Sequence, residues 1–209
     1  MNGFLEKYIN QLIKYCKIPK FQNERALSMM LSLYIEEIIF KITGEKFAFL
    51  TVELPIAENK SFRSTNIDYC LINDKRNLVL LVELKTEKQG ANKHFKDQLK
   101  GYKELKDVKY LKENLKRSIT AKRGKKHQRK YDVLKNQIGD YIFKADSVEI
   151  MYIAPDCIVN EELKNSQADF IKDEYKVSFS QILKIDIDDD FQIIKKYLAA
   201  LNTSLAEGN

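Results

Sequence analysis

The chain has 209 residues, of which 44% are hydrophobic and 32% charged, and its net charge is +6. This composition excludes a disordered chain and predicts one globular domain with a core of its own. No apolar run approaches the roughly 18 residues that a membrane-spanning helix needs. The N-terminus lacks the pattern of a signal peptide, and three widely spaced cysteines (Cys16, Cys70 and Cys157) suit a reducing compartment. We therefore expect a soluble cytoplasmic protein with no membrane partner, disulfide or zinc site.

Two helices are expected at the start of the chain. The first covers residues 2–17, and the second runs from about residue 23 to residue 42, before Gly44. Apolar residues recur along both at spacings of three and four, which is typical of an amphipathic helix. The predicted apolar positions are Phe4, Leu5, Tyr8, Leu12 and Tyr15 in the first helix, and Leu27, Leu31, Ile35, Ile38 and Ile42 in the second.

Three strands are expected next, because aromatic and β-branched residues become frequent. They cover residues 46–56, where Pro55 signals the end of the strand, then 65–72 and 78–86. The polar turn at 73–77 is short, so the second and third strands should form an antiparallel hairpin.

The second half of the chain alternates helices and strands. A helix is predicted over 92–115 and another over 131–143, and the basic stretch between them has no apolar period. A nearly continuous apolar run at 147–155 predicts a central strand, parallel to the third strand because a helix connects the two. A fifth strand within 175–187 and a closing helix over 188–205 complete an α/β sandwich with a mixed sheet, in one domain.

Two acids and a lysine are expected to meet at one end of the hairpin. Glu83 and Lys85 are two residues apart on a strand, so their side chains share a face. The turn at 73–77 brings Asp68 opposite Glu83. Two carboxylates this close repel unless a cation lies between them, and Mg²⁺, or Mn²⁺ in its place, prefers such oxygen ligands. The three side chains therefore predict metal-dependent hydrolysis of a phosphodiester.

The segments "NIDYCLI" and "LVLLVELK" together resemble the PD-(D/E)xK nuclease superfamily, over roughly residues 22–155. Asp68 matches the first acid, after Ile67 in place of proline, and Glu83-Leu84-Lys85 matches the ExK half. The resemblance implies a three-layer α/β/α sandwich with a restriction-endonuclease-like core. It also implies that Asp68, Glu83 and the Leu84 carbonyl ligate the metal, that Lys85 positions the attacking water, and that the products carry 5′-phosphate and 3′-hydroxyl ends.

Two further motifs agree with this family. Gln98 and Tyr102 in "DQLKGY" resemble the QxxxY motif of RecB-like members, whose side chains could contact the substrate backbone, although packing explains Tyr102 equally well. Members often carry a glutamate on the helix before the first strand. Glu24, Glu36 and Glu37 compete for that role, and Glu24 is preferred because its helical position falls on the apolar stripe.

The stretch 112–130 holds nine lysines or arginines and one acid, Glu113. A basic run is usually a solvated segment, but beside a nuclease site it favours contact with a phosphate backbone. The residues expected to bind nucleic acid are Lys116, Arg117, Lys122, Arg123, Lys125, Lys126, Arg129 and Lys130.

The function expected is a Mg²⁺-dependent nuclease acting on DNA rather than RNA, in restriction, phage defence, a mobile element or repair. A homodimer would be needed to cut both strands at once. Two alternatives stay open: a nucleic-acid-binding module that keeps the nuclease fold without cutting, and an interaction subunit whose basic segment binds an acidic protein.

Overall fold

The computed structural model describes residues 2–16, 23–57, 64–87, 93–120, 132, 135–164 and 168–206. The chain divides into two compact units. The first unit contains Met1–Glu45, Leu84–Lys96 and Tyr152–Asn209, and the second contains Lys46–Glu83 and Asp97–Met151. The expectation of a single domain stays a prediction.

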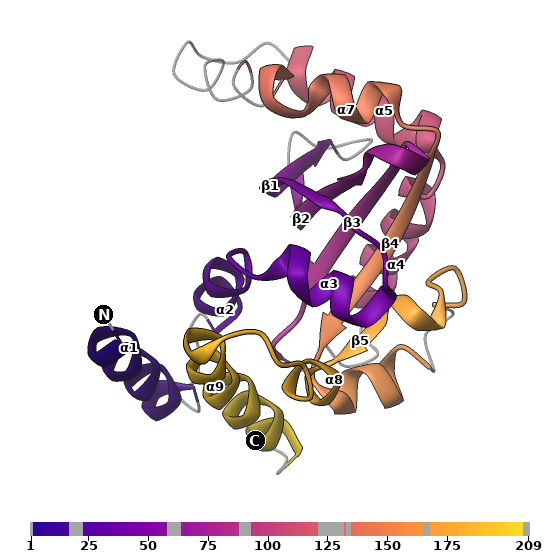
Figure 1. The fold of residues 1–209 in the computed structure, drawn as a ribbon. Coiled ribbons are helices and arrows are strands. Elements are labelled where there is room, and N and C mark those ends of the chain that lie inside the picture. Colours follow the sequence, from indigo (N-terminus) through magenta and orange to yellow (C-terminus); the bar gives the residue numbers. More distant parts are fainter. Residues whose placement is uncertain are drawn as a thin grey trace. The chain divides into compact units, whose positions relative to one another are not determined.

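The fold is α/β, as predicted, and its strands form one five-stranded mixed sheet (Figure 1). The strands are β1 (Ala48–Ala57), β2 (Ser64–Asn73), β3 (Leu78–Leu84), β4 (Ser147–Ala154) and β5 (Lys176–Ser178), in the sheet order β1-β2-β3-β4-β5. β2 is antiparallel to β1 and to β3, whereas β4 and β5 are parallel. This arrangement is compatible with a three-layer α/β/α sandwich.

The third and fourth strands are parallel, as expected for a helical crossover. The amide of Asp146, just before β4, donates to the carbonyl of Asn77, just before β3, at 2.7 Å. At the other end, the amide of Lys85 donates to the carbonyl of Ile153 at 2.9 Å. One hydrogen bond joins the starts of β3 and β4 and the other joins their ends, so the two strands run in the same direction.

In the second unit, the β2–β3 hairpin has the predicted turn. It consists of the short 3₁₀ helix η1 (Asp74–Arg76) followed by Asn77, whose φ of 45° is in the left-handed region that asparagine tolerates. All seven residues of β3 are buried, which explains its apolar run. The expectation that β1 ends at Pro55 was wrong: Pro55 pairs with Asn66, and a proline fits there because β1 is an edge strand.

The single helix predicted over 92–115 is two helices, α4 (Lys93–Leu105) and α5 (Val108–Thr120). The break occurs because the Asp107 carboxylate accepts the amide of Lys109 at 2.9 Å and caps α5. α5 also extends into the stretch expected to lack structure, as far as Thr120, and residues 121–130 lie outside the described residues. The helix predicted over 131–143 appears as the π-helix η2 (Lys135–Gly139) and α7 (Asp140–Lys144).

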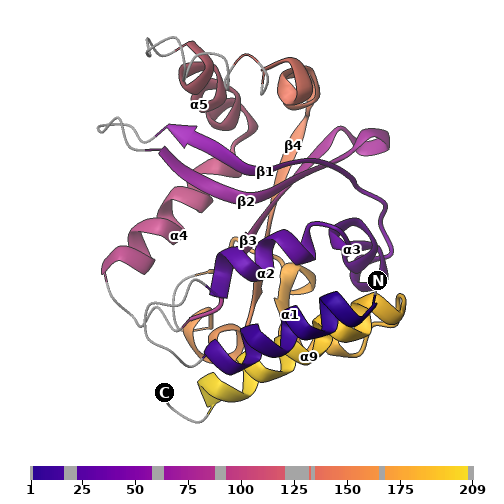
Figure 2. The ribbon, with the colours of Figure 1, turned by 90° about the vertical axis from the view of Figure 1, so that its left-hand side faces the viewer.

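The first unit is mainly helical. Its helices are α1 (Asn2–Tyr15), α2 (Asn23–Leu31), α3 (Ile35–Thr43), the π-helix η3 (Ile158–Glu162), the 3₁₀ helix η4 (Asp173–Tyr175), α8 (Phe179–Leu183) and α9 (Asp189–Ala206). α1 lies along α9 (Figure 2). The predicted apolar side of α1 was wrong in part, because Phe4 is 79% exposed and the buried residues are Ile9 and Leu12, followed by Cys16 just after the helix.

The helix predicted over 23–42 is interrupted between α2 and α3. The amides of Leu33 and Tyr34 donate to carbonyls three residues back, which tightens the last turn of α2 and ends it. Tyr34 then packs against Phe191 of α9, with ring centroids 5.1 Å apart. The apolar period continues through this segment, so the sequence pattern alone does not predict the break.

The Asp156 carboxylate ties the end of β4 to α8 and α9 within the first unit. It accepts hydrogen bonds from the Ser180 hydroxyl, from the Ser180 amide at 3.1 Å and from Asn202 Nδ2 at 2.8 Å. Partial burial acts to raise the pKa of Asp156, but these hydrogen bonds outweigh it and hold the pKa below its ordinary value of 3.8.

This network predicts acid sensitivity. A folded-state pKa below the unfolded value stabilises the fold above about pH 4, and that stabilisation is lost as the pH falls through the folded pKa. We expect the free energy of unfolding to fall less steeply below pH 4 in Asp156→Asn than in the wild type. Denaturant titrations between pH 5 and pH 2 measure this, with the exposed Asp169→Asn as the control. Equal pH dependence in all three proteins would contradict the role assigned to Asp156.

All three cysteines are free thiols. Complete burial raises the pKa of Cys70 to about 12, so its thiol is held in the unreactive protonated form.

Candidate functional site

The register of the β2–β3 hairpin leads to two acids at its open end. Pairing runs from Asn73 opposite Leu78 to Tyr69 opposite Val82, and the next residues outward are Asp68 and Glu83. Directly opposed residues of antiparallel strands project from the same face, with their Cβ atoms about 4.5–5.5 Å apart. Continued by one residue beyond Tyr69 and Val82, this register would set Asp68 opposite Glu83 on one face at the open end of the hairpin, where the sequence analysis expects them.

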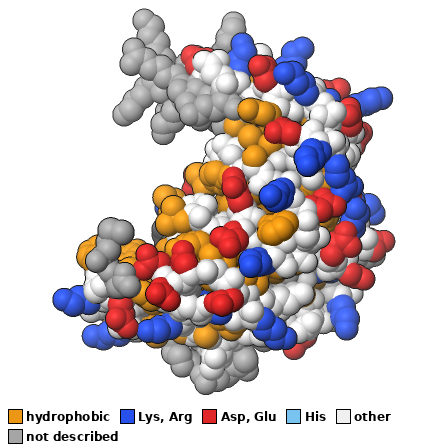
Figure 3. Space-filling view, viewed as in Figure 1, with side chains coloured by type: hydrophobic (Ala, Val, Ile, Leu, Met, Phe, Trp, Pro, Cys, Tyr) orange, Lys and Arg blue, Asp and Glu red, His pale blue; other side chains and the backbone are white. Residues whose placement is uncertain are grey.

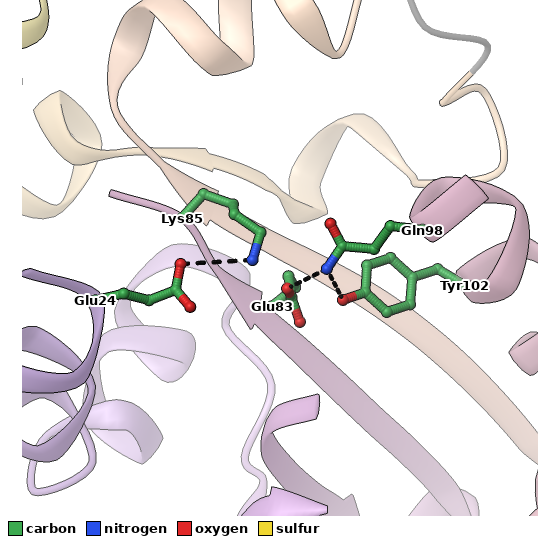
Figure 4. A network of polar contacts seen from close by, with 5 residues as sticks. All are labelled: Glu24, Glu83, Lys85, Gln98 and Tyr102. Atoms are coloured by element: carbon green, nitrogen blue, oxygen red, sulfur yellow. Dashed lines mark hydrogen bonds and ion pairs between the residues drawn. The ribbon is translucent and has the colours of Figure 1, made fainter. Parts of the chain in front are cut away.

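Glu83 is held in place by α4. Gln98 Nε2 donates one hydrogen bond to Glu83 Oε1 and another to the Tyr102 hydroxyl, both at 2.9 Å (Figure 4). Gln98 and Tyr102 lie one turn apart on α4 and so share a face. Tyr102 is 2% exposed and Glu83 is 3% exposed, so the amide fixes the orientation of a buried carboxylate.

The hydrogen bonds of Gln98 and Tyr102 can be compared with the roles expected for these two residues from the sequence. The sequence analysis expected these side chains to contact substrate or to pack in the core. It did not predict the hydrogen bond from Gln98 to Glu83. The only sequence signal for that bond is that an amide and a phenol four residues apart follow the ExK strand. Tyr102 belongs to the buried face of α4 with Leu99 and Leu105.

Lys85 and Glu24 form an ion pair within the first unit, with 3.5 Å between Lys85 Nζ and Glu24 Oε2 (Figure 4). Lys85 is only 6% exposed. A buried ammonium is costly unless it is paired and hydrogen-bonded, so its presence at this position calls for a reason. Its backbone amide is fixed by the bond to Ile153, which sets where the side chain starts.

Glu24 is the helix glutamate that meets the ExK lysine, but it lies elsewhere than expected. Its side chain is 40% exposed, not part of the buried stripe, which consists of Asn23, Leu27, Met30 and Leu31. Buried hydrogen bonds fix the start of α2: Asn23 Nδ2 donates to the Cys16 carbonyl at 3.1 Å, and the Tyr197 hydroxyl donates to Asn23 Oδ1 at 2.7 Å. Glu36 and Glu37 are exposed on α3.

Only Leu84 separates Glu83 from Lys85 along the chain. β3 ends at Leu84, a buried residue whose side chain points to the opposite face from its neighbours, and its carbonyl lies between the two charged residues along the backbone. The ExK segment thus carries a carboxylate held by Gln98 and an ammonium paired with Glu24.

The oxygen donors on the hairpin fit a hard divalent cation. Among the described residues, no group of three or more Asp, Glu, His or Cys side chains is placed to hold a metal ion. Mg²⁺ does not require such a group, because it usually binds one or two carboxylates and keeps several waters or substrate oxygens. The donors that the sequence analysis expects, Asp68, Glu83 and the Leu84 carbonyl, are oxygen ligands of the kind that Mg²⁺ prefers. The acidic run at 186–190 does not belong to this donor set and precedes a helix. Asp188 Oδ1 accepts a hydrogen bond from the Phe191 amide at 2.7 Å, at the start of α9.

The expected nucleic-acid contacts are described only in part. Lys116 and Arg117 are exposed near the end of α5, where Arg117 pairs with Glu113 at 3.5 Å. The other six lie outside the described residues: Lys122, Arg123, Lys125, Lys126, Arg129 and Lys130.

No protein-family model matches the chain, and neither a curated protein nor a solved structure matches it. In the part of the chain that the structure describes, no helix has both the length and the apolar composition needed to cross a bilayer.

Proposed function

We propose that this protein is a metal-dependent nuclease that hydrolyses phosphodiester bonds of DNA in the cytoplasm. The observation that supports the proposal most is the hairpin register, which continued by one residue would set Asp68 opposite Glu83, the carboxylate that Gln98 holds. The order of the elements around this hairpin, with ExK at the end of β3 and Gln98 and Tyr102 on the following helix, agrees with the resemblance to PD-(D/E)xK nucleases.

Each side chain has a distinct part in the proposed reaction. Asp68, Glu83 and the Leu84 carbonyl would hold Mg²⁺, which when bound makes hydroxide available near neutral pH and neutralises charge on the phosphate. The Lys85 ammonium would donate a hydrogen bond to the attacking water or to a phosphate oxygen, and Glu24 keeps that ammonium oriented. Gln98 acts as a positioning residue, because it fixes Glu83 Oε1 before any ligand arrives.

The bonds change as in any in-line phosphodiester hydrolysis. The water oxygen bonds to phosphorus and releases a proton to solvent, the bond from phosphorus to the 3′ oxygen breaks, and that oxygen takes up a proton from solvent. The products would be a 5′-phosphate and a 3′-hydroxyl. Restriction, phage defence, mobile elements and repair all need such a cut, and a homodimer would let the protein cut both strands together.

A cleavage assay tests the proposal. Purified protein is incubated with plasmid and with single-stranded DNA in Mg²⁺, in Mn²⁺ or in EDTA. We expect cutting with either metal, none in EDTA, and product ends that DNA ligase can rejoin because they keep the 5′-phosphate. Retention of DNA without cutting in any metal would instead support a non-catalytic binding module.

A further inference from the structure

The positive charge of this protein is concentrated in one stretch. Residues 93–130 contain 15 lysines or arginines and 4 acids, a net charge of +11. The remaining residues contain 21 basic and 26 acidic side chains, a net charge of −5. The overall charge of +6 therefore hides a basic segment on an otherwise acidic chain, which is the electrostatic pattern of a protein that binds a polyanion.

Five lysines in the described part of this stretch lie in two rows, one row on each of two helices. Lys100 and Lys103 lie on the solvent side of α4, and Lys109, Lys112 and Lys116 follow one side of α5. Spacings of three and four residues keep the lysines of each helix on one side. We call these five residues the lysine face. Figure 3 shows Lys and Arg side chains near the upper and right-hand edges, where Figure 1 places α5 and α4.

The lysine face lacks the compensating contacts that neighbouring basic residues have. Lys106 pairs with Glu149 at 3.1 Å and Arg117 pairs with Glu113 at 3.5 Å, whereas none of the five lysines makes an ion pair with a described residue. Like charges one helical turn apart destabilise a helix. Two such rows therefore suit a surface whose charge is balanced by a bound partner.

The chemistry of the lysine face fits a duplex better than a single strand. Over residues 96–105 and 108–120, the parts of α4 and α5 whose side chains the structure describes, no large apolar or aromatic side chain is exposed. Proteins that hold single strands use exposed aromatic rings on which bases stack, whereas a duplex presents regularly spaced phosphates. A face of ammonium groups without rings can bind phosphates but offers nothing to unstacked bases.

The α4 part of the lysine face, Lys100 and Lys103, points away from the side of α4 that holds Glu83. With about 100° per helical residue, the centre of the Lys100–Lys103 pair lies about 150° around α4 from the centre of the Gln98–Tyr102 pair. Phosphates bound to these lysines would therefore not be the phosphate that is cut.

We propose that the lysine face binds the phosphate backbone of duplex DNA at a distance from the scissile bond. The inference rests on the proposed function, because it takes the bound duplex to be the substrate of the nuclease. The face would supply salt-sensitive affinity that does not depend on base sequence, while the acids of the hairpin supply the chemistry.

Binding in EDTA tests this inference separately from cleavage. Fluorescence anisotropy measures the Kd of the wild type and of a variant with Lys→Gln at all five positions, for a labelled duplex and for a single strand of equal length. Glutamine keeps helix propensity close to that of lysine, and circular dichroism confirms folding. The control variant removes five exposed lysines elsewhere, by Lys→Gln at positions 7, 41, 144, 164 and 184.

We expect the lysine-face variant to bind duplex at least about 100-fold more weakly, and the slope of log Kd against log salt to fall by about 4 to 5, near 0.9 per lost phosphate contact. The control variant should change the Kd by less than about threefold, and the single strand should lose less affinity than the duplex. Any of three results would overturn the inference. The first is an equal loss of affinity in both variants, and the second is an equal or larger loss on the single strand. The third is competition by polyglutamate that is as effective as competition by duplex. If the face binds duplex but the wild type cuts nothing with Mg²⁺, the nuclease proposal fails while the binding result stands.

Discussion

Replacing Glu83 by glutamine should nearly abolish cleavage while the protein stays folded. Glutamine has the shape of glutamate, and its carbonyl oxygen can still accept the hydrogen bond that Gln98 now donates at 2.9 Å. What it lacks is the negative charge that a divalent cation requires. A metal contributes several kcal/mol to the transition state, so we expect the rate to fall by about 10³-fold, equivalent to about 4 kcal/mol.

Single-turnover cleavage in Mg²⁺ measures this effect, with circular dichroism as the test of folding. The matched control is Glu87→Gln, because Glu87 is an exposed glutamate four residues along the chain. It should cut at the wild-type rate. Wild-type cleavage by Glu83→Gln would remove Glu83 from the catalytic residues, and with it the assignment of the hairpin as the metal site.

Lys85→Met should cause the second large loss, about 10²- to 10³-fold in the rate of cleavage, through a different cause. Methionine fills a similar buried space but cannot donate a hydrogen bond to water or phosphate. The loss is of the size expected when one preorganised donor is removed from a reacting centre. Because the acids of the hairpin are unchanged, Mn²⁺ should bind the variant nearly as tightly as it binds the wild type.

The stability of Lys85→Met separates a catalytic lysine from a structural one. Its partner Glu24 is 40% exposed and can be hydrated once the ammonium is gone, so the free energy of unfolding should change by no more than about 1 kcal/mol. A second variant, Glu24→Gln, should lower the rate by only about tenfold, because it loosens the ammonium without removing it. If Lys85→Met cuts normally, or loses activity only in proportion to unfolding, Lys85 has no part in the reaction.

The hairpin could be predicted from sequence because its determinants are local. A buried apolar strand, a five-residue polar turn and a second strand fix the pairing, so Asp68 and Glu83 follow from counting outward from the turn. The same holds for the central place of β4, which needs only a continuous apolar run.

The features that the sequence did not reveal depend on tertiary contacts. The buried side of α1 is set by its packing on α9, and the aromatic residues Phe4 and Tyr8 suggested the wrong side. The break between α2 and α3 accompanies the packing of Tyr34 on Phe191. The break after α4 did have a local signal, the cap formed by Asp107, but the apolar period continues across it.

For the candidate site, the sequence predicted the residue types better than their partners. It identified Gln98 and Lys85, but not that Gln98 binds Glu83 or that Glu24 reaches Lys85 from an exposed position. Such partners depend on where α4 and α2 are placed in three dimensions, and a spacing of four residues shows only that Gln98 and Tyr102 share a face.

The most direct test is to locate the cation itself. Crystals of the wild-type protein soaked in Mn²⁺ should give an anomalous peak at the end of the β2–β3 hairpin, within about 2.5 Å of oxygens of both Asp68 and Glu83, and crystals of Asp68→Asn should lose that peak. A protein that cuts DNA in Mn²⁺ while the ion binds away from these two carboxylates would contradict the account.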